Sequence, residues 1–172
     1  MQNIENWKKV AGYETYSVSD LGNVRNDKTK RILQPADNGH GYFFVNLRTN
    51  KKTSKRKIHR LVAGAFLPNR EKKKYVDLIN NDTKNNKLEN LRWVTPSQNS
   101  QNAKKSKKNT SGIKGVTRHT QTNKWHAKIM LDGILISLGL FDNIDDAKQA
   151  RIIQANEVFG VFVNKCEIIL NV

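Results

Sequence analysis

The spacing of apolar residues predicts alternating short strands and helices along the chain. In the stretch 42–47, Phe43, Val45 and Leu47 share one face of a predicted strand, and the polar residues 49–52 turn the chain back into a second strand at 53–57. The spacing then becomes helical, with apolar residues at i, i+3, i+4, i+7 and i+8: Ile58, Leu61, Val62, Ala65 and Phe66. Pro68 ends this helix.

Two further segments repeat this strand and helix alternation. Residues 75–79 and 91–94 are predicted strands separated by an amide-rich loop, and a helix begins with Thr95 as N-cap and Pro96 at its first position. Toward the C-terminus, predicted strands at 113–118, 125–131 and 134–140 precede a helix that Asp142 or Asn143 caps and that ends near Gly160. The polar and basic run 104–110 cannot bury apolar surface and reads as a linker.

The pattern predicts an α+β chain of several small modules. We expect a β-rich module at 1–50, a strand–loop–strand–helix core at 51–103, the linker 104–110, a three-stranded antiparallel sheet with a helix at 111–164, and an extension at 165–172 that adds a packing strand.

Charge narrows the class of partner. The chain of 172 residues carries 31 Lys and Arg against 15 Asp and Glu, a formal net charge of +16, so a polyanion is the expected partner. A single cysteine, Cys166, excludes a disulfide framework and a cysteine zinc site and suits a reducing compartment. The polar N-terminus and the absence of long apolar runs predict a protein that is intracellular and cytoplasmic, with no membrane partner.

The strand–loop–strand–helix core brings two oxygen-bearing side chains toward one point. Asp77 lies on its first strand and Asn99 in the first turn of its helix, and such ligands suit one Mg²⁺ or Mn²⁺ ion and not zinc. The other polar residues of the loop have a simpler explanation, because Asn and Asp side chains satisfy the backbone of tight loops.

Within this core, Val76-Asp77, Asn85-Asn86 and the run from Glu89 to Thr95 resemble HNH endonucleases of the homing type found in phages and introns. The resemblance implies a ββα-metal fold that hydrolyses phosphodiester bonds. It makes Asp77 and Asn99 the metal ligands and Asn90 the residue that braces the loop.

The position of the general base departs from the family pattern. The family carries a His there, and this chain carries Leu78, which cannot accept a proton; general-base catalysis typically contributes about 10²–10⁴ in rate. His59, on the preceding helix, is a weak candidate for a substitute base, and a bracing hydrogen bond is the favoured role for it.

The stretch WKKVAGYETYSVSDLGNVRN is similar to a modular motif fused ahead of nuclease cores in homing enzymes. The alternative, a β-hairpin packed by its aromatic residues, explains Trp7, Tyr13 and Tyr16 equally well. The stretches SGIKGVTRHTQTNKWHAKI and LGLFDNIDDAKQA, with Phe159, Gly160 and Asn164, resemble an APETALA-type DNA-binding domain, in which a three-stranded sheet enters the major groove of DNA.

The candidate DNA-contacting residues fall into two groups. Around the core, basic residues offer phosphate contacts, with a solvated surface as the alternative: Lys51, Lys52, Lys55, Arg56, Arg92, Lys104 and Lys105. In the C-terminal module, the resemblance implies DNA contacts by Arg118, Trp125, Lys128, Lys114, His119 and Lys124. Core packing is the alternative for Trp125.

We therefore predict a monomeric HNH endonuclease of a mobile element or virus, acting on double-stranded DNA with one divalent ion and no small-molecule substrate, its activity lowered by Leu78. Two alternatives stay open. The chain can be a DNA-binding regulator or relic without catalysis, which Leu78 favours, or an RNA-binding protein, which the lack of aromatic stacking motifs disfavours.

Overall fold

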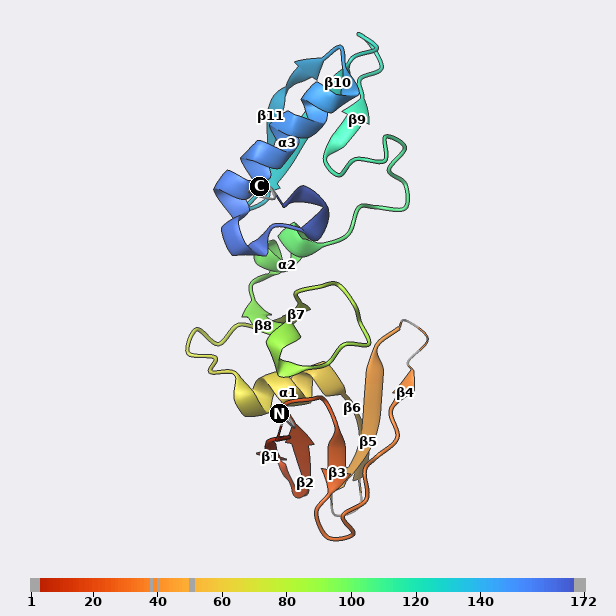
Figure 1. Cartoon of the computed structure of the whole chain (residues 1–172), viewed down its shortest axis with the longest axis vertical. Coiled ribbons are helices and arrows are strands. Elements are labelled where there is room, and N and C mark those ends of the chain that lie inside the picture. The colour runs from red at the N-terminus through yellow and green to blue at the C-terminus, as the bar shows by residue number, and fades with distance from the viewer. Residues whose placement is uncertain (1–3, 38, 40, 50–51, 169–172) are drawn as a thin grey trace. The chain divides into compact units, whose positions relative to one another are not determined.

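The computed structural model describes residues 4–37, 39, 41–49 and 52–168, and the chain divides into two compact units, 1–95 and 96–172 (Figure 1). Helices and short antiparallel strands are mixed in both units. The first unit contains β1 (Trp7–Val10), β2 (Tyr13–Ser19), β3 (Val24–Asn26), β4 (Ala36–Asp37), β5 (Phe43–Thr49), β6 (Lys52–Lys57), α1 (Ile58–Phe66), β7 (Tyr75–Leu78) and β8 (Leu91–Val94). The second contains α2 (Pro96–Asn102), β9 (Val116–Arg118), β10 (Trp125–Leu131), β11 (Ile134–Phe141) and α3 (Ile144–Phe159).

The first unit is built from three small sheets around α1. Their strand orders are β1-β2-β3, β4-β5-β6 and β7-β8, and α1 packs against strands of all three sheets (Figure 1). The apolar stripe predicted for residues 58–66 faces this core, where Ile58 and Val62 are fully buried. Leu67 leaves the helical conformation directly before Pro68, because the residue preceding a proline is driven to extended backbone.

One apolar core crosses the boundary that the sequence placed near residue 50. Val18 and Val24 from the N-terminal sheet share a cluster with Leu47, Leu78 and Leu91. Backbone contacts join the same parts, since the Leu88 amide donates to the Asp20 carbonyl at 2.7 Å. At Gly22, where φ is +88°, a Cβ would lie 3.0 Å from the Asn86 side chain. The described residues up to Thr49 and the strands that follow therefore form one folded body.

The second unit is a three-stranded sheet of order β11-β10-β9 with α3 on one face. Val116, Ala127 and Ala147 are fully buried where α3 meets the sheet, because the short alanine side chains allow close approach. The cap of α3 is Asn143, whose side chain accepts a hydrogen bond from the Asp145 amide.

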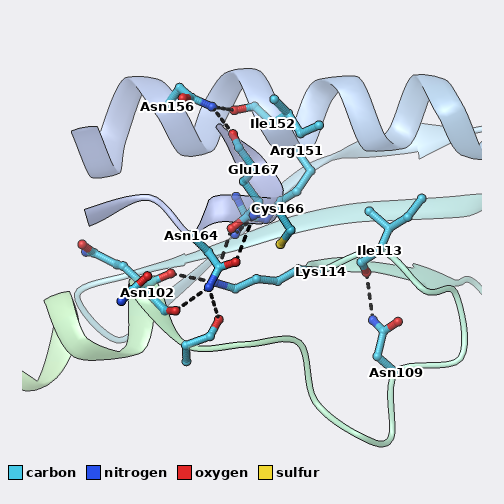
Figure 2. Close-up of polar contacts among 12 residues, drawn as sticks. Asn102, Asn109, Ile113, Lys114, Arg151, Ile152, Asn156, Asn164, Cys166 and Glu167 are labelled. Carbon is cyan, nitrogen blue, oxygen red and sulfur yellow. Dashed lines mark hydrogen bonds and ion pairs between the residues drawn. The ribbon is translucent and has the colours of Figure 1, made fainter. Parts of the chain in front are cut away.

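The segment after α3 folds back onto this unit. Residues Lys165–Glu167 form a 3₁₀ turn in place of the predicted strand, and residues 169–172 lie outside the described part of the chain. The Asn164 side-chain amide donates to the carbonyls of Asn102 and Ala103, and this contact ties the segment to the end of α2 (Figure 2).

Replacing Gly115 by alanine is expected to destabilise the second unit by about 2–4 kcal/mol, because positive φ and steric overlap each cost on the order of 1–3 kcal/mol. The residue has φ +74°, and a Cβ there would overlap the Arg151 side chain and lie 2.6 Å from the Lys128 carbonyl oxygen. Gly112→Ala is the matched control, since Gly112 has φ +77° and open space around it. Thermal unfolding of both variants measures the difference, and equal melting temperatures would refute the packing argument.

Candidate functional site

Asp77 and Arg92 form a largely buried ion pair on neighbouring strands. The two residues face each other across the β7–β8 ladder, and the Asp77 Oδ2 lies 2.8 Å from the Arg92 Nε and 2.7 Å from its Nη2. The Asp77 residue is 6% exposed. The ladder therefore holds a carboxylate in one orientation, with its charge balanced by a guanidinium that donates twice to the same oxygen.

Asn90 spans the loop that follows β7. Its side-chain oxygen accepts from the Asn80 amide at 2.9 Å, and its side-chain nitrogen donates to the Asn85 carbonyl at 2.8 Å. The backbone carbonyl of Asn90 also accepts from the Ile79 amide at 2.9 Å. These are bracing contacts of the kind the HNH resemblance implies for this residue; they fix the loop beside Asp77.

Leu78 packs in the apolar core of the first unit. It is 5% exposed and pairs across the ladder with Leu91, another member of the same cluster. Successive residues of a strand point to opposite faces, so Leu78 lies on the core side while the neighbouring carboxylate lies on the other. The side chain at this position contributes packing and no proton acceptor.

His59 is buried at the start of α1, with its ring 5.3 Å from that of Tyr42. Burial, with smaller contributions from Lys57 and Arg60, lowers the pKa of His59 from 6.5 to about 4. Its Nδ1 has no hydrogen-bond partner among the described residues, so the bracing bond is not found at that nitrogen. An imidazole with so low a pKa is a weak base for catalysis near neutral pH.

Acidification is expected to destabilise the protein through His59. The unfolded chain binds this proton near pH 6.5 and the folded chain only near pH 4, so stability is full above pH 6.5 and is lost as pH falls toward 4. Between pH 7.5 and 4.5 the free energy of unfolding should fall by about 2 kcal/mol more than in His59→Gln. Denaturant unfolding of both proteins at the two pH values measures this, and parallel losses would contradict it.

The predicted second ligand, Asn99, is an exposed residue of α2 and belongs to the second unit. Its partnership with Asp77 stays a prediction from the sequence. Among the residues that the structure describes, no cluster of three or more His, Cys, Asp or Glu side chains is placed to hold a metal. A carboxylate oxygen such as that of Asp77 is a ligand type that Mg²⁺ and Mn²⁺ bind, and the choice of ion stays a prediction from the sequence.

The hairpin of β5 and β6 carries exposed cations on both faces of its edge strand. Lys52, Lys55 and Arg56 are exposed on β6, with Lys52 and Arg56 on one face and Lys55 on the other, while Lys51 lies outside the described residues. Aromatic residues support these cations: the Arg56 Nε donates to the Tyr13 hydroxyl at 2.9 Å, and the Lys55 Nζ lies 4.8 Å from the centre of the Phe44 ring. Orienting these cations in advance lowers the entropy cost of holding a polyanion.

The residues predicted to contact DNA in the C-terminal module lie on both faces of its sheet. Arg118 and Trp125 pair across β9 and β10 on the same face as Val116 and Ala127, the face that α3 covers, and the Arg118 guanidinium stacks 4.6 Å above the Trp125 ring. Lys128 lies on the opposite face, paired with Ser137. Trp125 packs against the cluster under α3, and of the three residues predicted to face DNA, Lys128 lies on the open face. The DNA contacts themselves stay predictions from the sequence.

The remaining predicted contacts have mixed surroundings. Lys114 is turned inward, with its Nζ 3.3 Å from Glu167 and donating to the Gln101 carbonyl at 2.6 Å. Lys124 forms an exposed ion pair with Asp142. The Nδ1 of His119 lies 2.9 Å from the Thr122 hydroxyl. Lys104 and Lys105 are exposed in the segment after α2.

Sequence reasoning missed the buried ion pairs of Glu167 with Arg151 and Lys114, and it missed His126 on the open face, whose Nε2 lies 2.8 Å from the Ser137 hydroxyl. Alternation along β10 was the available signal for His126. No local pattern identifies the ion pairs, because Lys114 and Glu167 are joined only by the fold. Within the described ranges, no helix has the length and apolar character needed to cross a bilayer.

Two segments of the chain match known protein families. Residues 5–48 match the NUMOD4 motif, and residues 56–101 match the HNH endonuclease family. The uncharacterized HNH endonuclease L247 of Acanthamoeba polyphaga mimivirus is 46% identical over 100 residues, which are 55% of this chain and 25% of that protein. The DNA endonuclease I-HmuI of Bacillus phage SP01 is 36% identical over 94 residues, 54% of each chain.

A solved structure is similar as well. The structure titled "DNA binding and cleavage by the HNH homing endonuclease I-HmuI" superposes with a TM-score of 0.54 at 36% identity, covering 56% of each chain. The chain thus spans about a quarter of the length of its viral relative and about half of the phage enzyme.

Proposed function

We propose that this chain, whose residues 56–101 match HNH endonucleases, is a DNA endonuclease of the homing type that hydrolyses phosphodiester bonds. The observation that carries the proposal is the buried Asp77 carboxylate, held by Arg92 and by the β7–β8 ladder inside the matching segment. A protein that only binds DNA through basic residues has no need of a buried, oriented carboxylate beside a loop whose backbone the Asn90 side chain holds at Asn80 and Asn85.

Asp77 and Asn99 are the residues we propose to hold one Mg²⁺ or Mn²⁺ ion. A bound ion of this kind supplies charge stabilisation at the scissile phosphate and the leaving 3′-oxygen. Arg92 keeps the Asp77 carboxylate oriented, and Asn90 braces the loop that follows β7. The attacking water receives no help from Leu78, so we expect hydrolysis slower than in a chain with a base at that position.

Binding of double-stranded DNA is proposed to rest on the β5–β6 hairpin and on the open face of the C-terminal sheet. The related phage enzyme is described as binding and cleaving DNA. The net charge of +16 supports the same partner. Lys128 and Ser137 would then face the base edges, as donors and acceptors suited to groove readout.

Neutralising the hairpin is expected to weaken DNA binding by about 10- to 100-fold, because three phosphate contacts would be lost. In the variant Lys52→Gln, Lys55→Gln and Arg56→Gln, the slope of log K against log salt should fall by about 2.7, since each contact contributes about 0.9. Fluorescence anisotropy with a labelled duplex measures both quantities. Lys28→Gln, Lys30→Gln and Arg31→Gln, three exposed or half-exposed cations outside the hairpin, are the matched control. Equal losses in both variants would refute the hairpin as the contact surface.

The catalytic part is tested by incubating supercoiled plasmid with the full chain and Mg²⁺ or Mn²⁺. Open-circular or linear product that a chelator prevents supports the proposal. Binding of DNA without product, under conditions where a variant with a restored base cuts, would assign the chain instead to the DNA-binding alternative that Leu78 favours.

A further inference from the structure

A basic cavity lies within the second unit, between α3, the segment that follows α2 and the 3₁₀ turn at Lys165–Glu167 (Figure 2). Its volume is about 420 Å³. Five cationic side chains and one carboxylate line it: Lys104, Lys105, Lys114, Lys148, Arg151 and Glu167. This excess of positive charge around one cavity favours an anionic ligand.

Arg151 is the buried centre of this cavity wall. The residue is 3% exposed, and its Nη2 lies 2.9 Å from Glu167 Oε1. Its Nε and Nη1 have no hydrogen-bond partner among the described residues. Burial lowers the pKa of Arg151, while the Glu167 carboxylate opposes that change. A guanidinium buried with two unsatisfied donors is costly, and an acceptor entering the cavity would offset the cost.

Glu167 does not balance the charge that surrounds it. The same carboxylate contacts Arg151 and Lys114, at 2.9 Å and 3.3 Å, so one negative charge serves two buried or half-buried cations. Lys148 on α3 and Lys104 and Lys105 beyond α2 are exposed and add three more positive charges to the lining. An anionic group placed among these side chains would meet donors from three separate segments of the chain.

We propose that this cavity binds a phosphate-bearing anion of mononucleotide size. Arg and Lys are the residues that recognise phosphate, through paired donors and through point charge respectively. The volume falls within the range of about 300–1,000 Å³ usual for small-ligand pockets. Ile113 and Ile152 line the same cavity and offer apolar surface to the uncharged part of such a ligand.

The site is distinct from the surfaces proposed to hold duplex DNA. It is lined by α3, which covers the face of the sheet opposite Lys128, and it contains none of the hairpin cations. The phosphate can come from a free mononucleotide or from the backbone of bound DNA. Only the second source rests on the proposed function.

Titration calorimetry on the full chain with AMP, inorganic phosphate and uncharged adenosine tests the site. AMP should bind at least 10-fold more tightly than adenosine. Lys148→Gln should weaken AMP binding at least 10-fold, because a hydrogen bond to a charged group contributes about 1.5–3 kcal/mol. Lys128→Gln, on the opposite face, should leave AMP binding unchanged. Lys148 is exposed, so its variant folds, which Arg151 variants need not do.

The DNA arm repeats the salt titration of duplex binding with Lys148→Gln. If no free anion binds at millimolar concentration, but the salt slope falls by about 0.9 in Lys148→Gln and stays unchanged in Lys28→Gln, the phosphate belongs to DNA. Lys28 is an exposed cation outside the cavity. Binding of AMP when the chain binds no duplex supports the free ligand, independently of the endonuclease proposal. The inference is overturned if neither arm responds to Lys148→Gln, or if Lys128→Gln weakens AMP equally.

Discussion

Replacing Asp77 by asparagine is expected to lower DNA cleavage by about 10³-fold or more, since loss of a metal-holding carboxylate removes several kcal/mol of charge stabilisation at the phosphate. DNA affinity should change by less than the cleavage rate, because Asp77 is buried and is not one of the hairpin cations proposed to contact phosphate. Single-turnover cleavage of a saturating duplex separates the two quantities. Asp82→Asn is the matched control, since Asp82 is an exposed carboxylate in the loop that follows the same strand.

The Asp77 variant also leaves Arg92 without its ion-pair partner, and breaking a buried pair is strongly destabilising. The double variant Asp77→Asn with Arg92→Gln removes the unpaired charge and should regain stability while staying inactive. Thermal unfolding of the single and double variants shows whether lost cleavage reflects lost folding. Cleavage at the native rate by the folded double variant would show that Asp77 has no catalytic role.

Introducing a base with Leu78→His is expected to raise the cleavage rate by about 10²-fold, the lower end of the usual contribution of general-base catalysis. The same change should lower the free energy of unfolding by about 1–3 kcal/mol, because an imidazole replaces a leucine that is 5% exposed in the apolar cluster. Rates are compared at a temperature well below both melting points, so that the loss of stability does not obscure the gain.

Leu78→Asn is the control for placing a polar side chain at this position, because its amide disturbs the apolar core but cannot serve as a base. A gain with histidine and none with asparagine supports a missing base. Equal rates for all three proteins would mean that position 78, on the core side of β7, does not reach the reacting water.

Local elements were predictable because their signals are local. The expected strands at 91–94 and 125–131 match β8 and β10, and the helix expected from residue 58 ends at Phe66, before Pro68. Apolar periodicity and proline placement depend only on neighbouring residues, so the sequence contains them directly.

The arrangement of those elements was less predictable. The core shared by Val18 and Leu91 unites segments far apart in the sequence, and no composition change marks it. Arg118 was expected to face DNA. Alternation with the buried Val116 places it on the side of α3, where it is exposed, so its contact with DNA stays a prediction.

The polar residues of the candidate site were also only partly predictable from the sequence. The motif residues Asp77 and Asn90 were identifiable by their spacing, whereas the Arg92 ion pair depends on the register of two strands. The inward turn of Lys114 onto Glu167 depends on how the chain folds back after α3, and only the structure supplies that.

Cleavage of supercoiled plasmid by the unmodified chain, followed over hours in Mg²⁺ or Mn²⁺ and in parallel with a chelator, tests the central claim most directly. We expect the unmodified chain to nick the plasmid slowly, only when the ion is present, and Asp77→Asn not to nick it. A chain that binds the plasmid and leaves it intact, both as it stands and with Leu78→His, would contradict the assignment as an endonuclease.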